Sequence, residues 1–270
     1  MNLVTSSRMY DAGPKAAAAW RALFDRVFAD LGVEVERIEH KHPLPIESLW
    51  EEPALFGAFM CGWPFVQGGA RMQAIAAPVP SPPRYESKPR YCSDFLVRED
   101  SGWARVEDAF GHRFGWTVAG SHSGFNAPRA FLSRFVSPMR SRLFSEVAGP
   151  LGSPATALDA LKSGSVDLVA LDGYWLDLVR HHDPARLEGV RAIGHTPWAP
   201  IPLLVAAANV DAVLSRRLRD HLAGAHAMPG YGALLSNVVL ERFVVPDVGA
   251  YEALEDLAAE AGRAGYAIIA

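Results

Sequence analysis

The feature that most constrains the fold is a succession of strand, turn and helix in residues 91–132. Apolar and β-branched residues in 91–97 and again in 114–118 predict two strands. The chain then turns through residues 120–124 and enters an apolar-periodic segment that predicts a helix beginning near Phe125. Strands that lead through glycine-containing turns into helices are typical of an α/β fold.

The turn, with the sequence Gly-Ser-His-Ser-Gly, predicts a binding site for an anion. The first N–H groups of a helix have no backbone acceptor one turn earlier, and the helix dipole puts partial positive charge beside them. Serine hydroxyls add donors, so we expect Ser121, His122 and Ser123 to surround an oxyanion. The alternative is that the serines only cap the helix and that His122 is a turn residue.

Composition limits the possible functions. Half of the 270 residues are apolar, which is enough for one large α/β domain or for two lobes with separate cores. The net charge is -4 and no basic block stands out, so a nucleic-acid partner is not expected. No apolar run is long enough to span a bilayer. The two cysteines, Cys61 and Cys92, have no CxxC spacing and predict two buried free thiols in preference to a disulfide, which is the alternative.

No metal or cofactor is expected. The adjacent histidines His181 and His182 point in different directions on a helix, and no third ligand follows at a regular spacing. Neither a Walker-type loop nor a dinucleotide fingerprint occurs. The turn resembles a nucleophile elbow, but its central residue is His122 where that motif requires serine. A catalytic residue is therefore not predicted.

The N-terminal part predicts a βαβ unit. Pro14 opens a helix and Gly32 ends it, and residues 33–38 alternate as a strand. A parallel pair of strands with a right-handed crossover is the expected arrangement. Further along, the proline-rich segment 78–89 predicts a loop, because proline removes a donor that a central strand needs.

Several short motifs follow one another in a characteristic order along the chain. They are Met9-Tyr10, Tyr91-Cys-Ser-Asp-Phe-Leu-Val-Arg98, the turn 120–124 with Pro128-Arg129, Gly152-Ser153, the segment 161–172, and Ile193-Gly-His-Thr-Pro197 with Pro200-Ile-Pro202. In their order and spacing they resemble the substrate-binding proteins of phosphate/phosphonate-type ABC transporters.

The resemblance implies a type II periplasmic-binding-protein fold, with two α/β lobes, a ligand cleft and a hinge of two crossings. We expect residues 1–91 and 190–270 to form lobe one, and residues 92–189 to form lobe two with the anion-binding turn. The ligand-binding Ser/Thr-rich turn of the family falls on Ser121, His122 and Ser123. Its pocket tyrosines fall on Tyr10 and Tyr91, and its pocket aspartate on Asp172.

Other side chains are candidates for the wall of the same site. Asp172 ends an apolar strand, where a polar side chain commonly faces a binding site. Trp63, Tyr174 and Trp198 could add aromatic faces, which attract a cation. An amine-bearing phosphonate or phosphate ester is thus expected in preference to inorganic phosphate. The alternative is that these aromatic residues pack in the lobe cores.

The function expected from the resemblance is capture of a small phosphate- or phosphonate-like anion. The protein would be a monomer with no catalytic activity, and its partner would be an ABC transporter permease. The alternative is an enzyme of small-molecule biosynthesis on the same fold, because fold alone does not decide function.

Two features depart from the family pattern. Pro154 stands where similar proteins often have a polar residue, commonly histidine, after the Gly-Ser pair. The first residues lack the charged and apolar regions of a signal peptide. The sequence as written therefore predicts a cytoplasmic protein, and a periplasmic one if an export signal has been removed.

Overall fold

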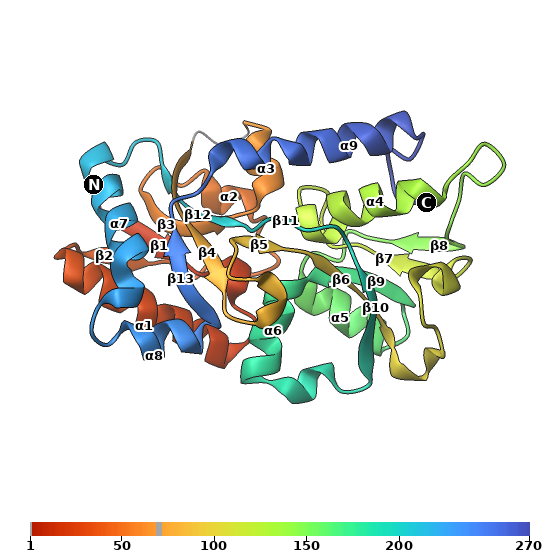
Figure 1. Ribbon diagram of the computed structural model, residues 1–270, viewed down its shortest axis with the longest axis horizontal. Helices are drawn as coiled ribbons and strands as arrows, with labels where there is room; N and C mark the ends of the chain where they lie inside the picture. The colour runs from red at the N-terminus through yellow and green to blue at the C-terminus, as the bar shows by residue number, and fades with distance from the viewer. Residues whose placement is uncertain (1, 69–71) are drawn as a thin grey trace. The chain divides into compact units, whose positions relative to one another are not determined.

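The structure is a computed structural model that describes residues 2–68 and 72–270. Met1, the first residue of the predicted lobe one, lies outside the described residues. The chain divides into two compact units, each with its own sheet and helices (Figure 1). Unit 1 consists of Met1–Arg90, Asp177–Asp183 and Pro200–Ala250. Unit 2 consists of Tyr91–Leu176, Pro184–Ala199 and Tyr251–Ala270.

In the described part of unit 1, the sheet has six strands. In spatial order they are β13 (Leu240–Val244), β4 (Met72–Pro80), β12 (Leu203–Ala207), β3 (Leu55–Met60), β1 (Leu3–Ser6) and β2 (Val35–Arg37). β1 is parallel to both β2 and β3, whereas β12 runs antiparallel to β3 and β4. The predicted βαβ unit is therefore present at one edge of a mixed sheet.

Helix α1 (Pro14–Leu31) forms as the sequence predicts. Proline occupies the first turn, and Gly32 ends the helix in a left-handed conformation with φ 65°. Its apolar face, which recurs at the helical period in the sequence, is buried in the core of unit 1: Trp20, Leu23, Phe24, Val27, Phe28 and Leu31. The other helices confined to this unit are α2 (Glu47–Trp50), α3 (Gly62–Val66), α7 (Ala212–Gly224) and α8 (Tyr231–Asn237).

The expected loop at residues 78–89 is partly wrong, because β4 continues to Pro80. Pro78 and Pro80 lie opposite Phe243 and Leu240 of β13. On the other side of β4, the pairing with β12 has its last partner at Ala76. The prolines thus lie where β4 has lost one of its two neighbours, so a missing N–H is tolerated there.

The sheet of unit 2 has five strands. In spatial order they are β10 (Val190–His195), β6 (Ser93–Arg98), β9 (Leu168–Asp172), β7 (Arg113–Gly115) and β8 (Glu146–Ala148). β6 is antiparallel to β10 and β9, whereas β7 is parallel to β8 and β9. The strand predicted at 91–97 is divided in two, because β5 (Arg90–Tyr91) pairs separately with β11 (Ala199–Pro200).

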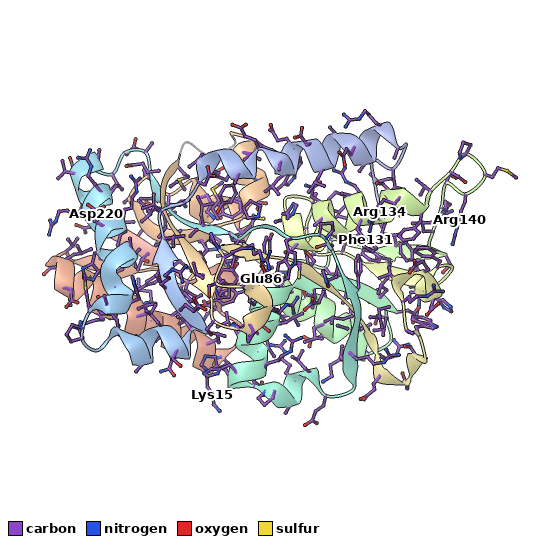
Figure 2. All side chains as sticks on the ribbon, viewed as in Figure 1. Lys15, Glu86, Phe131, Arg134, Arg140 and Asp220 are labelled. Carbon is purple, nitrogen blue, oxygen red and sulfur yellow. The ribbon has the colours of Figure 1, made fainter. Side chains whose placement is uncertain are left out.

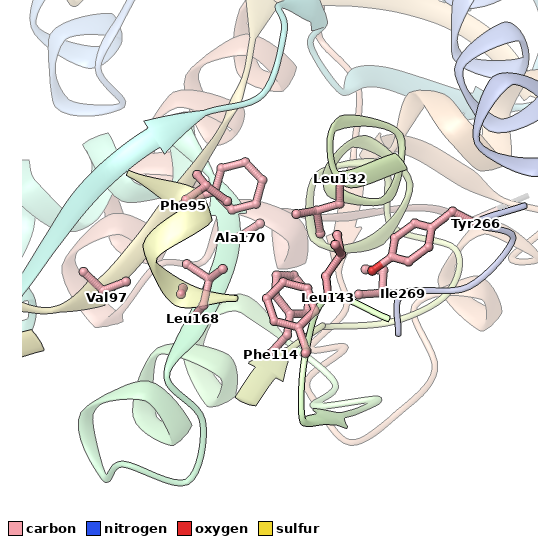
Figure 3. Packing of buried hydrophobic residues seen from close by; sticks show 12 residues of the cluster. Phe95, Val97, Phe114, Leu132, Leu143, Leu168, Ala170, Tyr266 and Ile269 are labelled. Atoms are coloured by element: carbon pink, nitrogen blue, oxygen red, sulfur yellow. The ribbon is translucent and has the colours of Figure 1, made fainter. Parts of the chain in front are cut away.

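The core of unit 2 joins its sheet to α4 (Ala127–Leu132) and to the last residues of the chain. Figure 3 shows Phe95, Phe114 and Leu132 packed near Tyr266 and Ile269. The remaining helices are α5 (Pro154–Lys162), α9 (Ala253–Arg263), and α6 (Gly173–His182), which starts in unit 2 and ends in unit 1.

The division into units differs from the predicted lobe boundaries at four places. Tyr91 lies in unit 2 instead of lobe one, and residues 177–183 lie in unit 1 instead of lobe two. Residues 190–199 were assigned to lobe one, but β10 forms backbone hydrogen bonds with β6 and lies in unit 2. Residues 251–270 were also assigned to lobe one. They belong to unit 2, where the N–H of Leu143 donates to the carbonyl of Ala270 at 2.8 Å. These long-range pairings leave no local signal in the sequence.

The expectations about membrane-spanning segments and about the cysteines can be compared with the structure of the described residues. None of the helices in this part of the chain has the length and apolar character required to cross a membrane. Cys61 and Cys92 are both buried, and neither forms a disulfide in the described part of the chain.

Candidate functional site

The predicted anion-binding turn lies at the start of a continuous helical run in unit 2. The run begins with a π-helical turn, His122–Asn126, and continues as α4. It therefore starts three residues earlier than the predicted Phe125. Ser121 is the extended residue before it, and the carbonyl of Ser121 accepts the N–H of Asn126 at 3.0 Å. π-Turns inside helices are frequent at functional sites.

The two serines of the turn have different roles. The Oγ of Ser121 accepts the N–H of Gly124 at 2.9 Å and so caps the helix. The Oγ of Ser123 lies 3.4 Å from that of Ser121, which is its one side-chain hydrogen-bond partner within residues 2–68 and 72–270. Ser121 thus performs the capping role considered above, while Ser123 is the better candidate to donate to a ligand.

Thr117 packs against the turn and holds it in position, and the sequence pattern did not indicate this role. Its N–H donates to the carbonyl of Gly124 at 3.4 Å, and its carbonyl accepts the N–H of Gly152 at 3.0 Å. Its side chain lies where a Cβ of Gly124 would stand. In the sequence, Gly124 indicates that the turn leaves no room for a side chain at this position. It does not indicate that Thr117 is the residue that fills the space.

His122 is buried, with 1% of its surface exposed. Its Nδ1 lies 3.2 Å from Nδ2 of Asn126, and Nδ2 of Asn126 also donates to the carbonyl of Leu254. Desolvation lowers the pKa of His122 to about 3. The imidazole is therefore neutral at neutral pH and adds no positive charge to the turn.

Three further predicted residues lie close to the turn. The ring of Tyr91 is 6.1 Å from the ring of His122. Asp172 ends β9 opposite Ser93 of β6, and β9 contacts the π-helical turn. Tyr174 follows Asp172 at the start of α6 and is fully buried. The structure thus brings six candidates of unit 2 to one region at the end of its sheet. The seventh, Trp198, follows β10 and is partly exposed, with its ring 5.9 Å from the ring of His195.

Asp172 also holds the start of α6. Its Oδ1 accepts the N–H of Tyr174 at 2.8 Å and that of Trp175 at 3.0 Å. A carboxylate at this position satisfies two donors of the first turn and interacts favourably with the helix dipole. Any charge that Asp172 offers to a ligand comes from a group already engaged in helix capping.

The candidates of unit 1 lie in different surroundings. Tyr10 is fully buried, and its ring packs against Trp20 at 6.3 Å and edge-on against Phe59 at 4.8 Å. This matches the alternative of core packing for Tyr10. Trp63 belongs to α3 and is partly exposed, so its ring remains accessible.

The departure at Pro154 has a local explanation. Pro154 is the first residue of α5, and Ser153 and Thr156 form a reciprocal capping box. The Oγ of Ser153 accepts the N–H of Thr156 at 3.1 Å, and the N–H of Ser153 donates to the Oγ1 of Thr156 at 3.0 Å. This helix start is therefore closed by its own side chains.

Solved structures of periplasmic-binding-protein-like proteins have the same fold as this chain. A binding protein component of an ABC phosphonate transporter from Pseudomonas aeruginosa superposes with TM-score 0.81 at 16% identity, over 97% of this chain and 87% of that one. PhnD1 from Prochlorococcus marinus in complex with methylphosphonate gives TM-score 0.76 at 17% identity, over 97% and 98%. A Xanthomonas citri protein bound to ATP gives 0.65 at 18% identity, over the same shares.

The sequence identifies the family. Residues 12–251 match the family described as ABC transporter, phosphonate, periplasmic substrate-binding protein. The chain belongs to this family, and the resemblance inferred from its motifs is confirmed. No curated protein sequence matches the chain.

Proposed function

We propose that this chain is the substrate-binding component of an ABC transporter and binds a small phosphonate or phosphate ester. The observation that carries the proposal is the turn at Ser121–Ser123 at the start of a helical run, in a chain of this family. A helix start supplies N–H donors and partial positive charge to an anion, and the Ser123 hydroxyl adds a further donor.

The chemistry of the turn favours an anion held mainly by hydrogen bonds. His122 is neutral, so the ligand's charge is met by the helix start and by hydroxyl groups. Each hydrogen bond to a charged group contributes about 1.5–3 kcal/mol. The neighbouring Asp172 would repel a bare anion and attract an amine. We therefore propose 2-aminoethylphosphonate as a better ligand than inorganic phosphate.

The partner we propose is the permease of an ABC transporter, and the compartment is the periplasm. Both follow from the family description, which is that of a periplasmic component. The expectation of a cytoplasmic protein has no support from the family. We also propose that the protein is a monomer, as expected from the sequence.

An enzyme on the same fold is the competing function, and the family assignment favours binding without turnover. The two differ in the fate of the ligand. After incubation with the protein, mass spectrometry should recover 2-aminoethylphosphonate unchanged. A new product would establish the enzyme alternative.

Calorimetry of native protein and of Ser123→Ala tests the binding site directly. Methylphosphonate, 2-aminoethylphosphonate and inorganic phosphate are titrated into both. Loss of the hydroxyl should weaken the affinity by about tenfold to a hundredfold. Ser145→Ala, at an exposed position of the same unit, is the matched control and should bind like the native protein. Equal affinities for native protein and Ser123→Ala contradict the proposed site.

A further inference from the structure

Unit 2 contains a long stretch of sequence that carries positive charge and no negative charge. Residues 109–145 include no aspartate or glutamate, although the whole chain has a net charge of -4. The arginines of this stretch are Arg113, Arg129, Arg134, Arg140 and Arg142. The arginines are not adjacent and form no basic block, but the segment as a whole is basic on an acidic protein.

Two of these arginines are used inside the fold. Arg113 forms an ion pair with Asp167 at 2.8 Å, and Arg129 donates to Asn126 and to the carbonyl of Ala267. The other three lie in residues 134–142, which we call the basic loop. In the described part of the chain, Arg134, Arg140 and Arg142 have no carboxylate partner.

Aromatic rings hold two of these three guanidinium groups in place. Arg134 lies over the ring of Phe131 at 4.2 Å, and Arg140 lies over the ring of Phe110 at 4.7 Å. Figure 2 labels Phe131, Arg134 and Arg140 in this part of unit 2. Stacking fixes the cations near the surface without neutralising them, because the ring carries no net charge.

The tip of the basic loop is apolar and fully exposed. Ser137 and Arg140 exchange two backbone hydrogen bonds of 3.1 and 2.9 Å, which close a turn around Pro138 and Met139. The side chain of Met139 is 100% exposed. Figure 1 shows this loop, between α4 and β8, projecting from the rest of unit 2.

This combination fits the surface of an anionic lipid bilayer better than a protein partner. A flexible apolar side chain can enter the interface while the neighbouring guanidinium groups stay at the level of the headgroups. A stable protein interface needs roughly 800 Å² on each partner, with an apolar centre and a polar rim. The basic loop instead has only the apolar side chains of Pro138 and Met139 at its tip, with cations around them.

We propose that the basic loop binds reversibly to anionic phospholipid membranes through Arg134, Arg140, Arg142 and Met139. Such binding keeps the protein close to a membrane surface and does not depend on which solute the Ser121–Ser123 turn accepts. Each arginine near an anionic surface contributes about fivefold to binding, and the contribution falls as salt rises.

Co-sedimentation with lipid vesicles tests the proposal on the full chain. The vesicles contain phosphatidylcholine alone, or phosphatidylcholine with about one third phosphatidylglycerol. We expect the native protein to bind only the vesicles with phosphatidylglycerol. The variant Arg134→Gln/Arg140→Gln/Arg142→Gln should bind about a hundredfold more weakly. Met139→Glu, at a fully exposed position where folding is not at risk, should also weaken binding at least severalfold.

A charge-matched variant separates the effect of the basic loop on vesicle binding from the effect of net charge. Lys15→Gln/Lys41→Gln/Arg216→Gln removes the same charge from exposed positions of unit 1 and should bind nearly as well as native protein. If this control loses as much binding as the loop variant, net charge is responsible and the proposal is wrong. Absence of binding to the phosphatidylglycerol vesicles at low salt also overturns it, and leaves an acidic protein surface as the partner.

Discussion

Thr117 and Gly124 lie so close together that only a hydrogen atom fits on the α-carbon of Gly124 between them. A Cβ on Gly124 would lie 2.0 Å from Oγ1 of Thr117 and 2.9 Å from its Cβ. The two residues are also joined by the hydrogen bond from the N–H of Thr117 to the carbonyl of Gly124. The segment after β7 and the candidate binding turn therefore hold each other in position.

Gly124→Ala should consequently destabilise unit 2 and weaken ligand binding. Relief of the clash requires the turn to move, and overpacking of this kind costs about 1–3 kcal/mol or more. Urea unfolding measures the stability, and calorimetry with 2-aminoethylphosphonate measures the affinity. Gly262→Ala is the control, because this position in α9 has open space and a helical alanine there should be neutral or stabilising.

The double variant Thr117→Ala/Gly124→Ala tests whether the clash with Thr117 causes the loss of stability. Removing Oγ1 and Cγ2 of Thr117 relieves the closest contacts but leaves its Cβ in place. Partial recovery of stability is expected. If the single Gly124→Ala variant is as stable as native protein, the close approach of these residues does not shape the turn.

Ser121 allows the capping role to be separated from ligand binding. Ser121→Ala removes the acceptor for the N–H of Gly124 and should cost about 1 kcal/mol of stability. Ser121→Asp keeps a capping oxygen but places a carboxylate beside the proposed anion. Its thermal stability should stay near that of native protein while its affinity for methylphosphonate falls by at least tenfold. Retained affinity in Ser121→Asp argues against an anion at this turn.

The sequence predicted those parts of the fold that depend on local pattern. The periodic face of α1, with Gly32 at its end, and the Gly-Ser-rich helix start at Ser121 carry their structure within one element. The assignment of β10 could not be predicted in this way, because it depends on pairing with β6 about a hundred residues earlier. The same holds for Pro78 and Pro80 of β4. The sheet tolerates them because the pairing of β4 with β12 ends at Ala76.

The candidate site shows the same distinction. Residue type and position located the turn, but they could not tell that Ser121 would cap the helix and that Ser123 would not. They also could not show that His122 is buried, because histidine has only an intermediate tendency to be buried. Thr117 was missed since its role rests on a neighbour seven residues away in sequence.

Asp172→Asn should discriminate between ligands with and without an amine. The amide oxygen of asparagine can still accept the N–H groups of Tyr174 and Trp175, so α6 should remain capped. Loss of the charge should weaken binding of 2-aminoethylphosphonate and leave methylphosphonate unchanged or bound more tightly. Calorimetry with both ligands measures this, and an equal change for both would remove the reason for proposing an amine.

Asp167 should make unit 2 sensitive to strong acid. The Arg113 guanidinium is the main cause that lowers the pKa of this carboxyl to about 2, and Arg98 contributes. Because the unfolded-state pKa is near 3.9, the ion pair stabilises the fold above about pH 4 and is lost as the pH falls through about 2. Asp167→Asn should lose about 2 kcal/mol at neutral pH and progressively less in acid. Asp159 is exposed and forms an ion pair with Arg186, so Asp159→Asn provides the control variant, for which little change is expected.

His122 predicts a second pH dependence, in a milder range. Burial lowers its folded-state pKa to about 3, whereas the unfolded chain titrates near 6.5. Between these values the unfolded state binds a proton that the folded state does not, so stability is full above about pH 6.5 and falls as the pH decreases toward 3. At about pH 5 the loss attributable to this residue is about 2 kcal/mol.

His122→Gln, which cannot titrate, should therefore lose less stability than native protein between about pH 7.5 and pH 5 in urea unfolding. His112→Gln removes an exposed histidine of the same unit and should keep the native pH dependence. If His122→Gln and native protein lose the same stability over this range, the imidazole is not buried as the structure shows, and it could then carry charge toward the ligand.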